Sequence, residues 1–345
     1  MSDQLVQVAE AMVAKGKGIL AADESSGTMK KRLDGIGVES TETNRRDYRE
    51  MLFRTADAMS SHISGVILFD ETLRQEAADG TPLVQLINDT GAIPGIKIDK
   101  GAHPLAGAPG EKVTEGLDGL RDRLAEYYEL GARFTKWRAV IDIGREGDRS
   151  IPSAYGIEAN AHGLARMAAL SQEQGLVPIV EPEVLMDGDH DIDRCAEVTE
   201  WTLELVYAAL HNQRVFLEGS VLKPNMVLSG KLCAMQAGVD EVAEKTVRVL
   251  KRCVPAAVPG IVFLSGGQTD LDATAHLSAI NAGFDTPWNV SFSYGRALQA
   301  APLKAWSGNA SNLPAGQAAF RHRARMNGLA TLGEWSSELE NEAAA

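Results

Sequence analysis

The residues best suited to covalent chemistry in this sequence stand where short apolar runs end. Lys223 follows the letters GSVL and precedes Pro224, so its amine lies beside apolar surroundings. Poor solvation and neighbouring cations both disfavour an ammonium, and the neutral amine that results is a nucleophile toward carbonyl groups. Lys100 and Lys136 end other apolar runs and are the candidate neighbours. The pattern predicts a nucleophilic amine at Lys223; the alternative is a lysine whose ammonium reaches out into water.

Carboxylates accompany this amine. In VPIVEPE, Glu181 and Glu183 are two residues apart, so in a strand both point to the same side. Like charges at that spacing are expected to raise each other's pKa, which lets a carboxyl exchange protons near neutral pH. Asp23, at the end of the first apolar run, is a candidate second base. The alternative is that Glu181 and Glu183 only neutralise Lys136 and Arg138, which share one side of their own strand.

Two glycine-containing segments predict an anion site. LSGGQ (264–268) and SYGRA (293–297) each follow an apolar run. Glycines let backbone N–H groups approach an anion, and Arg296 adds a fixed positive charge in the second segment. The prediction is a phosphate site formed by both segments; the alternative is that these glycines only make turns.

Eight short apolar or β-branched runs must position these residues. They are GILAADES (18–25), GVILFDE (65–71), GIKIDKG (95–101), FTKWRAVI (134–141), VPIVEPE (177–183), VFLEGSVLKP (215–224), GIVFLSGG (260–267) and WNVSFSYGR (288–296). Nearly continuous apolar character is typical of parallel strands buried on both faces, and each interval has room for a crossover helix. The run ends in order are Asp23, Glu71, Lys100, Lys136, Glu181, Lys223, Ser265 and Arg296.

Helical periodicity fills the intervals between the runs. The predicted helices cover 41–60, 114–131, 158–174, 198–208, 239–250 and the segment after a capping box at Thr269 and Asp272. Thr41 is a predicted N-cap, and Gly131 a predicted helix end. We therefore expect a single-domain α/β fold over residues 1–345, a (β/α)8 TIM barrel with its core at about 16–310 and a C-terminal helix and tail at about 311–345. In such a barrel the catalytic groups lie at the C-terminal ends of the strands.

Composition excludes several functions. The 345 residues hold 34 Lys plus Arg against 47 Asp plus Glu, a net charge of −13, which disfavours a nucleic-acid partner. The three cysteines form no CxxC pair, so we expect neither a disulfide framework nor a thiolate zinc site, and a reducing cytoplasm fits best. We expect no export signal and no membrane span.

No metal or cofactor is predicted either. The histidines include no HExxH pair, and none ends an apolar run. The acidic segment 187–193 departs from a calcium loop because Ile192 stands where glycine is needed, and it is predicted to begin a helix instead.

With these residues in view, the sequence resembles the class I, Schiff-base-forming fructose-1,6-bisphosphate aldolases from about Gly16 to Trp306. The resemblance rests on motifs in the family's order: GKGILAADES, NRRDYR, GVILF followed by ETL, IK and DKG, GLDGL, KWR, VPIVEPE, LEG and LKPNM, FLSGGQ, FSYGRALQ and KAW. It implies reversible cleavage of fructose 1,6-bisphosphate to dihydroxyacetone phosphate and glyceraldehyde 3-phosphate in glycolysis and gluconeogenesis. It also implies a metal-independent cytoplasmic enzyme and, by family analogy, a homotetramer.

The resemblance implies roles for the catalytic residues. Lys223 matches the lysine that forms the imine with the ketose, and Glu181 the residue that shuttles protons during carbinolamine dehydration. Asp23 matches the base that takes the hydroxyl proton as the aldehyde leaves, and Lys136 the cation that supports both carboxylates.

The resemblance also implies binding residues. One phosphate is expected at Ser265, Gly266, Gly295 and Arg296, the other near Ser25, Thr28 and Lys100, with Arg138 and Glu183 in the surrounding charge network.

The sequence departs from the family pattern in places. Thr28 stands where the family commonly has serine, and Pro302 is expected to kink the last barrel helix and shift Arg296 slightly. Animal members end in a tyrosine that assists proton exchange on the enamine, whereas no tyrosine follows Tyr294 here. Two other functions stay open at this point: another lysine-dependent aldolase such as a transaldolase, and a non-catalytic phosphosugar-binding scaffold. So does the preference between fructose 1,6-bisphosphate and fructose 1-phosphate.

Overall fold

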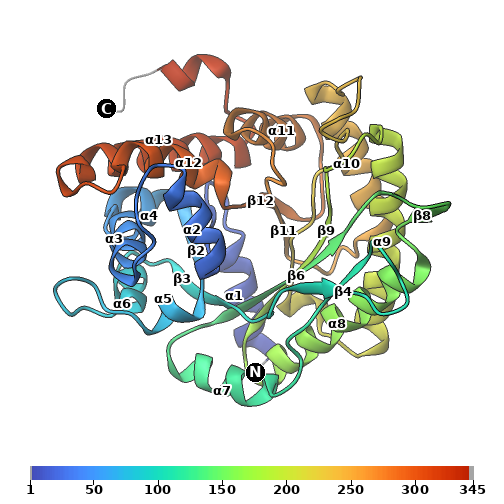
Figure 1. The fold of residues 1–345 in the computed structure, drawn as a ribbon, viewed down its shortest axis with the longest axis horizontal. Helices are drawn as coiled ribbons and strands as arrows, with labels where there is room; N and C mark the ends of the chain where they lie inside the picture. Colours follow the sequence, from blue (N-terminus) through green and yellow to red (C-terminus); the bar gives the residue numbers. More distant parts are fainter. Residues whose placement is uncertain (1, 342–345) are drawn as a thin grey trace.

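Eight parallel strands close into a barrel in this computed structural model, which describes residues 2–341 (Figure 1). The order around the barrel is β1, β12, β11, β10, β9, β6, β3, β2. Their bounds are β1 Gly18–Ala22, β2 Ile63–Leu68, β3 Ile93–Lys97, β6 Phe134–Ile141, β9 Val177–Val184, β10 Val221–Leu222, β11 Gly260–Phe263 and β12 Asn289–Tyr294. Each predicted run overlaps one of these strands, although β2 and β3 begin two residues before their runs, and the predicted (β/α)8 fold class is confirmed.

Helices surround the barrel and follow the strands in chain order. Their bounds are α2 Ser26–Asp34, α3 Glu42–Phe53, α4 Ala56–His62, α5 Asp70–Arg74, α6 Leu83–Asp89, α7 Leu120–Glu129, α8 Ala154–Glu173, α9 Ile192–Asn212, α10 Val239–Cys253, α11 Asp270–Gly283 and α12 Arg296–Trp306. The predicted caps hold: Thr41 accepts from the Asn44 amide, and Thr269 from the Asp272 amide at 3.0 Å. Asp191 caps α9, so segment 187–193 begins a helix as predicted.

Two predicted helices are shorter in the structure. The stretch 41–60 is divided into α3 and α4 at Thr55, whose φ of −81° and ψ of 69° lie outside the helical region. The stretch 114–131 becomes helical only at Leu120, because Gly116 and Gly119 have φ values of +129° and +63° that a right-handed helix does not accept.

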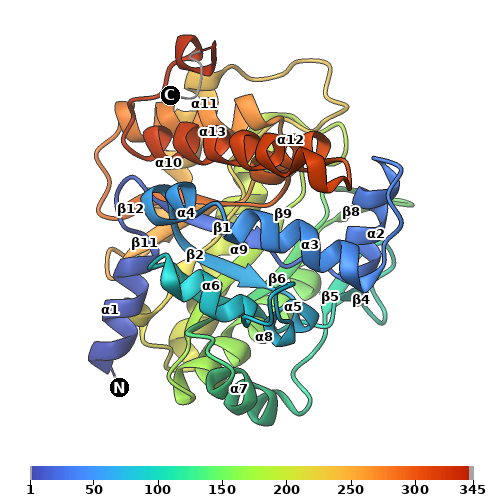
Figure 2. The ribbon, with the colours of Figure 1, turned by 90° about the vertical axis from the view of Figure 1, so that its left-hand side faces the viewer.

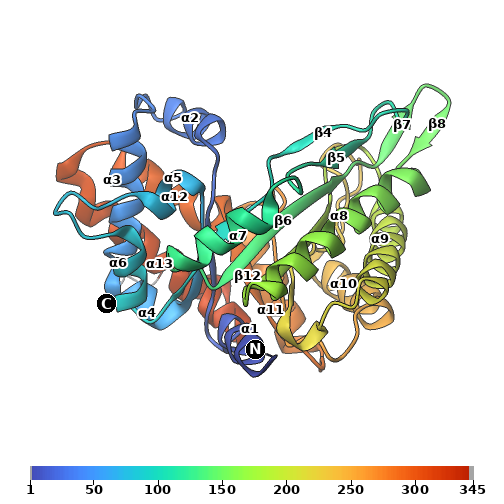
Figure 3. The same ribbon diagram turned by 90° about the horizontal axis from the view of Figure 1, so that it is seen from below.

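Short elements at both ends of the barrel escaped the sequence analysis. Two hairpins project from the C-terminal side of the barrel, β4 Ala102–Pro104 with β5 Lys112–Thr114 and β7 Gly144–Glu146 with β8 Arg149–Ile151 (Figure 3). Helix α1, Ser2–Met12, lies at the opposite end, where Leu5, Ala9 and Met12 pack on the inward side chains of the strands. In the predicted run 215–224, a 3-10 turn η1, Leu217–Gly219, leaves only the two residues of β10 in the sheet.

The C-terminal helix α13, Leu313–Thr331, lies beside α12 across the outside of the barrel (Figure 2), with the 3-10 turn η2, Ala310–Asn312, between them. Helix α12 continues past Pro302 to Trp306. The described part of the chain finishes with η3, Ser337–Asn341, and the rest of the predicted tail lies outside the described residues. Within residues 2–341 no helix is both long and apolar enough to cross a membrane.

Candidate active site

Lys223, Glu181, Lys136 and Asp23 meet inside the C-terminal mouth of the barrel. The Nζ of Lys223 lies 3.2 Å from Oε1 of Glu181, whose Oε2 lies 2.9 Å from the Nζ of Lys136. The same Lys136 ammonium donates to Oδ2 of Asp23 at 3.0 Å. The side chains of all four residues are largely or fully buried, so amine, carboxylate, ammonium and carboxylate form one unbroken chain of contacts.

Strand register explains why these residues meet. Val221 and Leu222 pair with Ile179 and Val180, and the amide of Lys223 donates to the Val180 carbonyl at 2.8 Å, which brings Lys223 level with Glu181. On the other side of β9, Lys136 pairs with Ile179, so its side chain also reaches Glu181. Inward positions on neighbouring strands therefore converge on one carboxylate.

The two lysines have opposite pKa shifts. Burial lowers the pKa of Lys223, and the Lys136 charge lowers it further, against the attraction of Glu181. Burial also acts to lower the pKa of Lys136, but Asp23 and Glu181 outweigh it and raise that pKa above its ordinary value. Lys136 thus holds its proton, while Lys223 is the lysine that can release one and act as a nucleophile.

Both carboxylates have lowered pKa values. Burial raises the pKa of Asp23, but Lys136, Lys223 and Lys97 more than reverse the effect. In the same way, Lys136 and Lys223 outweigh the burial of Glu181. The prediction that Glu183 raises the pKa of Glu181 is wrong, because Glu183 is paired with Arg138 and Glu181 faces two lysines. The ion pairs predicted as the alternative are therefore present.

These groups line a cavity of about 500 Å³ at the barrel mouth. From the predicted set it brings together Asp23, Ser25, Thr28, Lys136, Arg138, Glu181, Glu183, Lys223, Ser265, Gly266, Gly295 and Arg296. Ser265 and Gly266 follow β11, and Arg296 is the first residue of α12, whose N-terminus favours an anion. A Cβ on Gly267, where φ is +103°, would lie 3.1 Å from Nη2 of Arg296, so glycine leaves this side of the loop open to the cation.

The expectation for Lys100 is corrected by the structure. Strand β3 ends at Lys97, and the side chain of Lys97 lines the cavity beside Asp99. Lys100 is exposed and is absent from the cavity lining of the described chain, while its amide donates to the Glu115 carbonyl at 2.8 Å. Both lysines belong to the run GIKIDKG, and the position at which β3 ends determines which of them lines the cavity.

Sequence reasoning missed several cavity residues. Besides Lys97 and Asp99, the lining includes Glu24, Lys31, Arg32 and Ser293. The letters MKKR before the hydrophobic Leu33 were a usable signal, because they put a basic face on the helix that follows Ser25. The buried hydroxyl of Ser293 lacks a hydrogen-bond partner among the described residues, which fits a group that faces a ligand.

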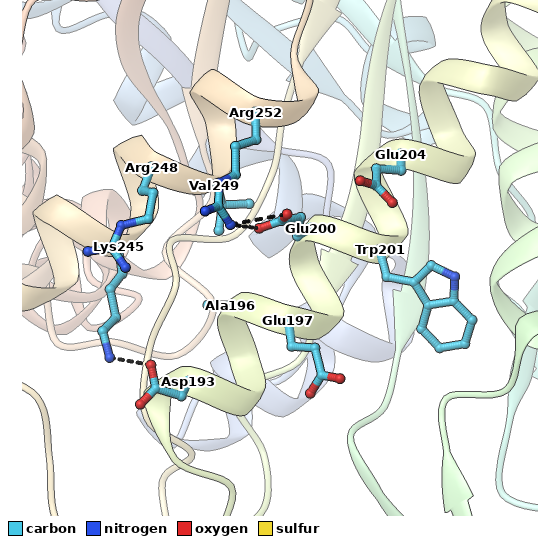
Figure 4. A pocket seen from close by; sticks show the side chains of 10 residues that line it. All are labelled: Asp193, Ala196, Glu197, Glu200, Trp201, Glu204, Lys245, Arg248, Val249 and Arg252. Carbon is cyan, nitrogen blue, oxygen red and sulfur yellow. Dashed lines mark hydrogen bonds and ion pairs between the residues drawn. The ribbon is translucent and has the colours of Figure 1, made fainter.

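A groove of similar volume, about 510 Å³, lies between α9 and α10 (Figure 4). Each of its cations is paired: Lys245 contacts Asp193 at 2.5 Å, Arg252 contacts Glu200 at 2.9 Å, and Arg248 contacts Glu244 outside the groove. The cations of this groove are therefore already held by carboxylates of the chain. The barrel mouth, with its buried and convergent groups, is the candidate active site. Across residues 2–341, no three His, Cys, Asp or Glu side chains form a group that could hold a metal ion.

The sequence and the fold both match known proteins over nearly the whole chain. The family model described as "Fructose-bisphosphate aldolase class-I" matches residues 4–345. The "Probable fructose-bisphosphate aldolase class 1" of Xanthomonas campestris pv. campestris is 61% identical over 334 residues, which cover 96% of this chain and 98% of that protein. "Fructose-bisphosphate aldolase 6, cytosolic" of Arabidopsis thaliana is 53% identical over 340 residues, with 98% of this chain and 93% of that protein covered.

A solved structure is similar too. It is the fructose-bisphosphate aldolase from Plasmodium falciparum in complex with TRAP and a small molecule inhibitor, with a TM-score of 0.94 and 46% identity over 97% of this chain and 96% of that chain. The predicted resemblance is confirmed. Because the family model covers the chain almost end to end, and relatives share more than half of their residues with it, the chain belongs to the class I fructose-bisphosphate aldolase family.

Proposed function

We propose that the barrel mouth catalyses the reversible cleavage of fructose 1,6-bisphosphate to dihydroxyacetone phosphate and glyceraldehyde 3-phosphate through an imine at Lys223. Membership of the family supports the reaction. The observation that carries the mechanism is the lowered pKa of Lys223, whose amine lies 3.2 Å from the Glu181 carboxylate. A neutral amine is required for attack on the keto carbon, and a proton acceptor stands beside it.

Imine formation uses Glu181 twice. The Lys223 nitrogen bonds to C2 of the ketose, the carbonyl π electron pair moves to the C2 oxygen, and that oxygen takes a proton from solvent to become a hydroxyl. Glu181, ionised at rest because its pKa is lowered, takes a proton from the nitrogen. Glu181 then returns the proton to the C2 hydroxyl, which leaves as water while the nitrogen lone pair forms the C=N bond. Neighbouring Lys136, 2.9 Å from the carboxylate, stabilises its charged form before the first transfer and after the second.

Carbon–carbon cleavage uses Asp23. Its carboxylate takes the proton of the C4 hydroxyl, the C3–C4 electron pair moves into the iminium, and the aldehyde leaves an enamine on Lys223. The lowered pKa of Asp23 keeps it in the basic form, and its contact with Lys136 at 3.0 Å orients it. Protonation of the enamine and addition of water then release dihydroxyacetone phosphate. We assign that protonation to Glu181, whose carboxylate lies 3.2 Å from the Lys223 nitrogen. In this step Asp23 releases the C4 hydroxyl proton to solvent, and Glu181 takes a proton from solvent and passes it to the enamine.

The phosphates lie on opposite sides of the cavity in this proposal. Ser265, Gly266, Gly295 and Arg296 hold one of them. Ser25, Thr28 and Lys97, which replaces the predicted Lys100, approach the other, and Arg32 adds positive charge at the same mouth. Arg138, held by Glu183, completes the charge network.

Three further properties are proposed on family grounds. The chain acts in the cytoplasm, forms a homotetramer and consists of one domain over residues 1–345. Light scattering of the purified chain tests the tetramer, since a monomer of 37.0 kDa is readily distinguished from four copies.

The test is reductive trapping. Borohydride added with dihydroxyacetone phosphate should fix the triose on the peptide that carries residue 223, and Lys223→Met should abolish both the adduct and cleavage. Lys100→Met, an exposed lysine of the same mouth, is the matched control and should keep both. A map without added mass at residue 223, or loss of cleavage on adding a chelator, would contradict the proposal. Transfer of a ketol unit to an aldose in place of free cleavage would indicate a transaldolase.

A further inference from the structure

Arg49 in α3 is a fully buried arginine that the reaction leaves unexplained. It belongs to the motif NRRDYR, its residue exposure is 0%, and it is absent from the cavity lining within residues 2–341. Its Nη1 donates to the Thr72 hydroxyl at 2.7 Å, and its Nη2 donates to the Glu24 carbonyl at 2.8 Å. The carboxylates of Glu24 and Glu71 lie 3.6 and 3.8 Å away. A buried arginine with this many partners fixes whatever it contacts.

Glu24 is the contact that leads toward the cavity. It directly follows Asp23, and its Oε1 accepts from Nη1 of Arg32 at 2.5 Å and from Nε2 of Gln299 at 2.8 Å. The Gln299 amide also donates to the Ala21 carbonyl at 2.6 Å. The backbone is therefore held on both sides of Asp23. Arg32, a cation that lines the cavity, is oriented by the Glu24 carboxylate, and Arg49 in turn holds the backbone of Glu24.

The side-chain type matters for this contact. One guanidinium reaches a hydroxyl and a carbonyl at the same time because its donors form a rigid planar fork, whereas the single ammonium of a lysine at the same place keeps the charge without that geometry. If only the positive charge of Arg49 mattered, lysine would replace it without loss. If Arg49 orients the junction between β1 and α2, lysine should not replace it.

We propose that Arg49 is a positioning residue for substrate recognition: through Glu24 it fixes Arg32 against the cavity and so controls how tightly a sugar bisphosphate binds. This inference rests on the proposed function for the identity of the ligand. It concerns phosphate recognition only and does not require the imine step.

The experiment is a double-mutant cycle on binding. The probe is a hexitol 1,6-bisphosphate, which carries both phosphates and no carbonyl, and its Kd is measured by calorimetry for wild type, Arg49→Lys, Arg32→Met and the double variant. Arg49→Lys should weaken binding about 10-fold when Arg32 is present, the size expected for one charge-assisted contact, and less than about 2-fold when Arg32 is methionine. Because the probe forms no imine, the outcome is independent of whether Lys223 reacts.

Arg323→Lys is the matched control. Arg323 is also buried, donates to a threonine hydroxyl at 2.6 Å (Thr274), contacts a carboxylate at 2.7 Å (Glu340), and belongs to α13, away from the cavity lining. The Arg323→Lys variant should lower thermal stability as Arg49→Lys does, while its Kd stays within about 2-fold of the wild-type value.

Two results would overturn the inference. One is an unchanged Kd in a folded Arg49→Lys variant, and the other is that Arg49→Lys weakens binding equally with Arg32 present and with Arg32→Met. If Arg49→Lys does not fold, Thr72→Val decides. That change removes the hydroxyl that accepts from Arg49 while keeping its volume, and it should weaken binding about 3-fold only when Arg32 is present. A Thr72→Val Kd equal to that of wild type would overturn the inference in that case.

Discussion

The two ends of the barrel differ completely in chemistry although the same strands build both. At the N-terminal end, Ala21, Phe134, Ile179 and Val221 form an apolar layer together with α1. Two residues further along each strand come Asp23, Lys136, Glu181 and Lys223, and they form the ion cluster of the mouth. A step of two residues keeps a side chain on the inward face and moves it up one layer. The apolar layer that stabilises the barrel and the ion cluster that carries the chemistry are thus neighbouring layers of the same interior.

The contrast is strongest on β6, where Phe134 and Lys136 are consecutive inward residues. Phe134 fills the space that Gly95 leaves: a Cβ on that glycine would lie 2.2 Å from the ring. Lys136 instead contacts two carboxylates. Losing the first side chain should affect only folding, whereas losing the second should affect folding and chemistry together.

Lys136→Met should have the largest effect. It leaves Asp23 and Glu181 buried without their shared cation, which is expected to cost about 3–5 kcal/mol of unfolding free energy, and kcat should fall about 10³-fold. Urea unfolding and a coupled cleavage assay measure the two effects. A variant with wild-type kcat would show that the cluster does not need its central charge.

Phe134→Ala should cost about 3–5 kcal/mol of unfolding free energy through the cavity it creates, and nothing in kcat per folded molecule. The measurement is urea unfolding beside cleavage rates normalised to the folded fraction. A kcat loss above about 10-fold at full folding would mean that the two layers are mechanically coupled.

Glu181→Gln keeps the size of the side chain but removes its proton chemistry. We expect kcat to fall about 10²-fold or more, with the loss in imine formation. Slow borohydride trapping in single-turnover samples identifies the affected step. Glu183→Gln serves as the control for a nearby carboxylate that contacts Arg138 and neither lysine, and it should change kcat far less.

Lys97→Met and Lys100→Met test the corrected end of β3. Lys97 lines the cavity, so its loss should raise KM for the bisphosphate about 10-fold, while loss of the exposed Lys100 should stay within about 2-fold. Steady-state kinetics at fixed ionic strength separates the two. The reverse ranking would restore the original prediction for Lys100.

The smallest expected effect is on acid stability, and Asp23→Asn tests it in unfolding experiments, separately from the loss of the base for carbon–carbon cleavage. The pKa of Asp23 lies below its ordinary 3.8, so the unfolded chain takes up a proton first as pH falls through about 4, and the unfolding free energy decreases. The variant lacks this proton and should show a shallower loss between pH 5 and about pH 3 than wild type. Unfolding midpoints at stepped pH values measure the slopes, and parallel slopes would contradict the shift.

The sequence allowed the barrel strands and the ion cluster to be predicted because both leave local signals. Buried parallel strands give nearly unbroken apolar runs, and Asp23, Lys136, Glu181 and Lys223 interrupt or end them. The hairpins leave no such signal, since the three residues of β4 are all exposed. The pKa direction of Glu181 and the partners of Arg49 depend on distances between strands and helices far apart in the chain. No local pattern reports those distances.

The brevity of β10 has a practical consequence for engineering. Only two residues of this segment lie in the sheet, yet the amide of Lys223 is bonded to Val180 at 2.8 Å and the carbonyl of Pro224 accepts from Leu264 at 3.1 Å. The backbone at Lys223 is thereby fixed by hydrogen bonds on both sides, so it has little freedom to adapt to an aldehyde substrate of a different shape. Directed evolution toward new aldehydes should therefore find its gains in α2 and the projecting hairpins, and should find almost none in 220–224.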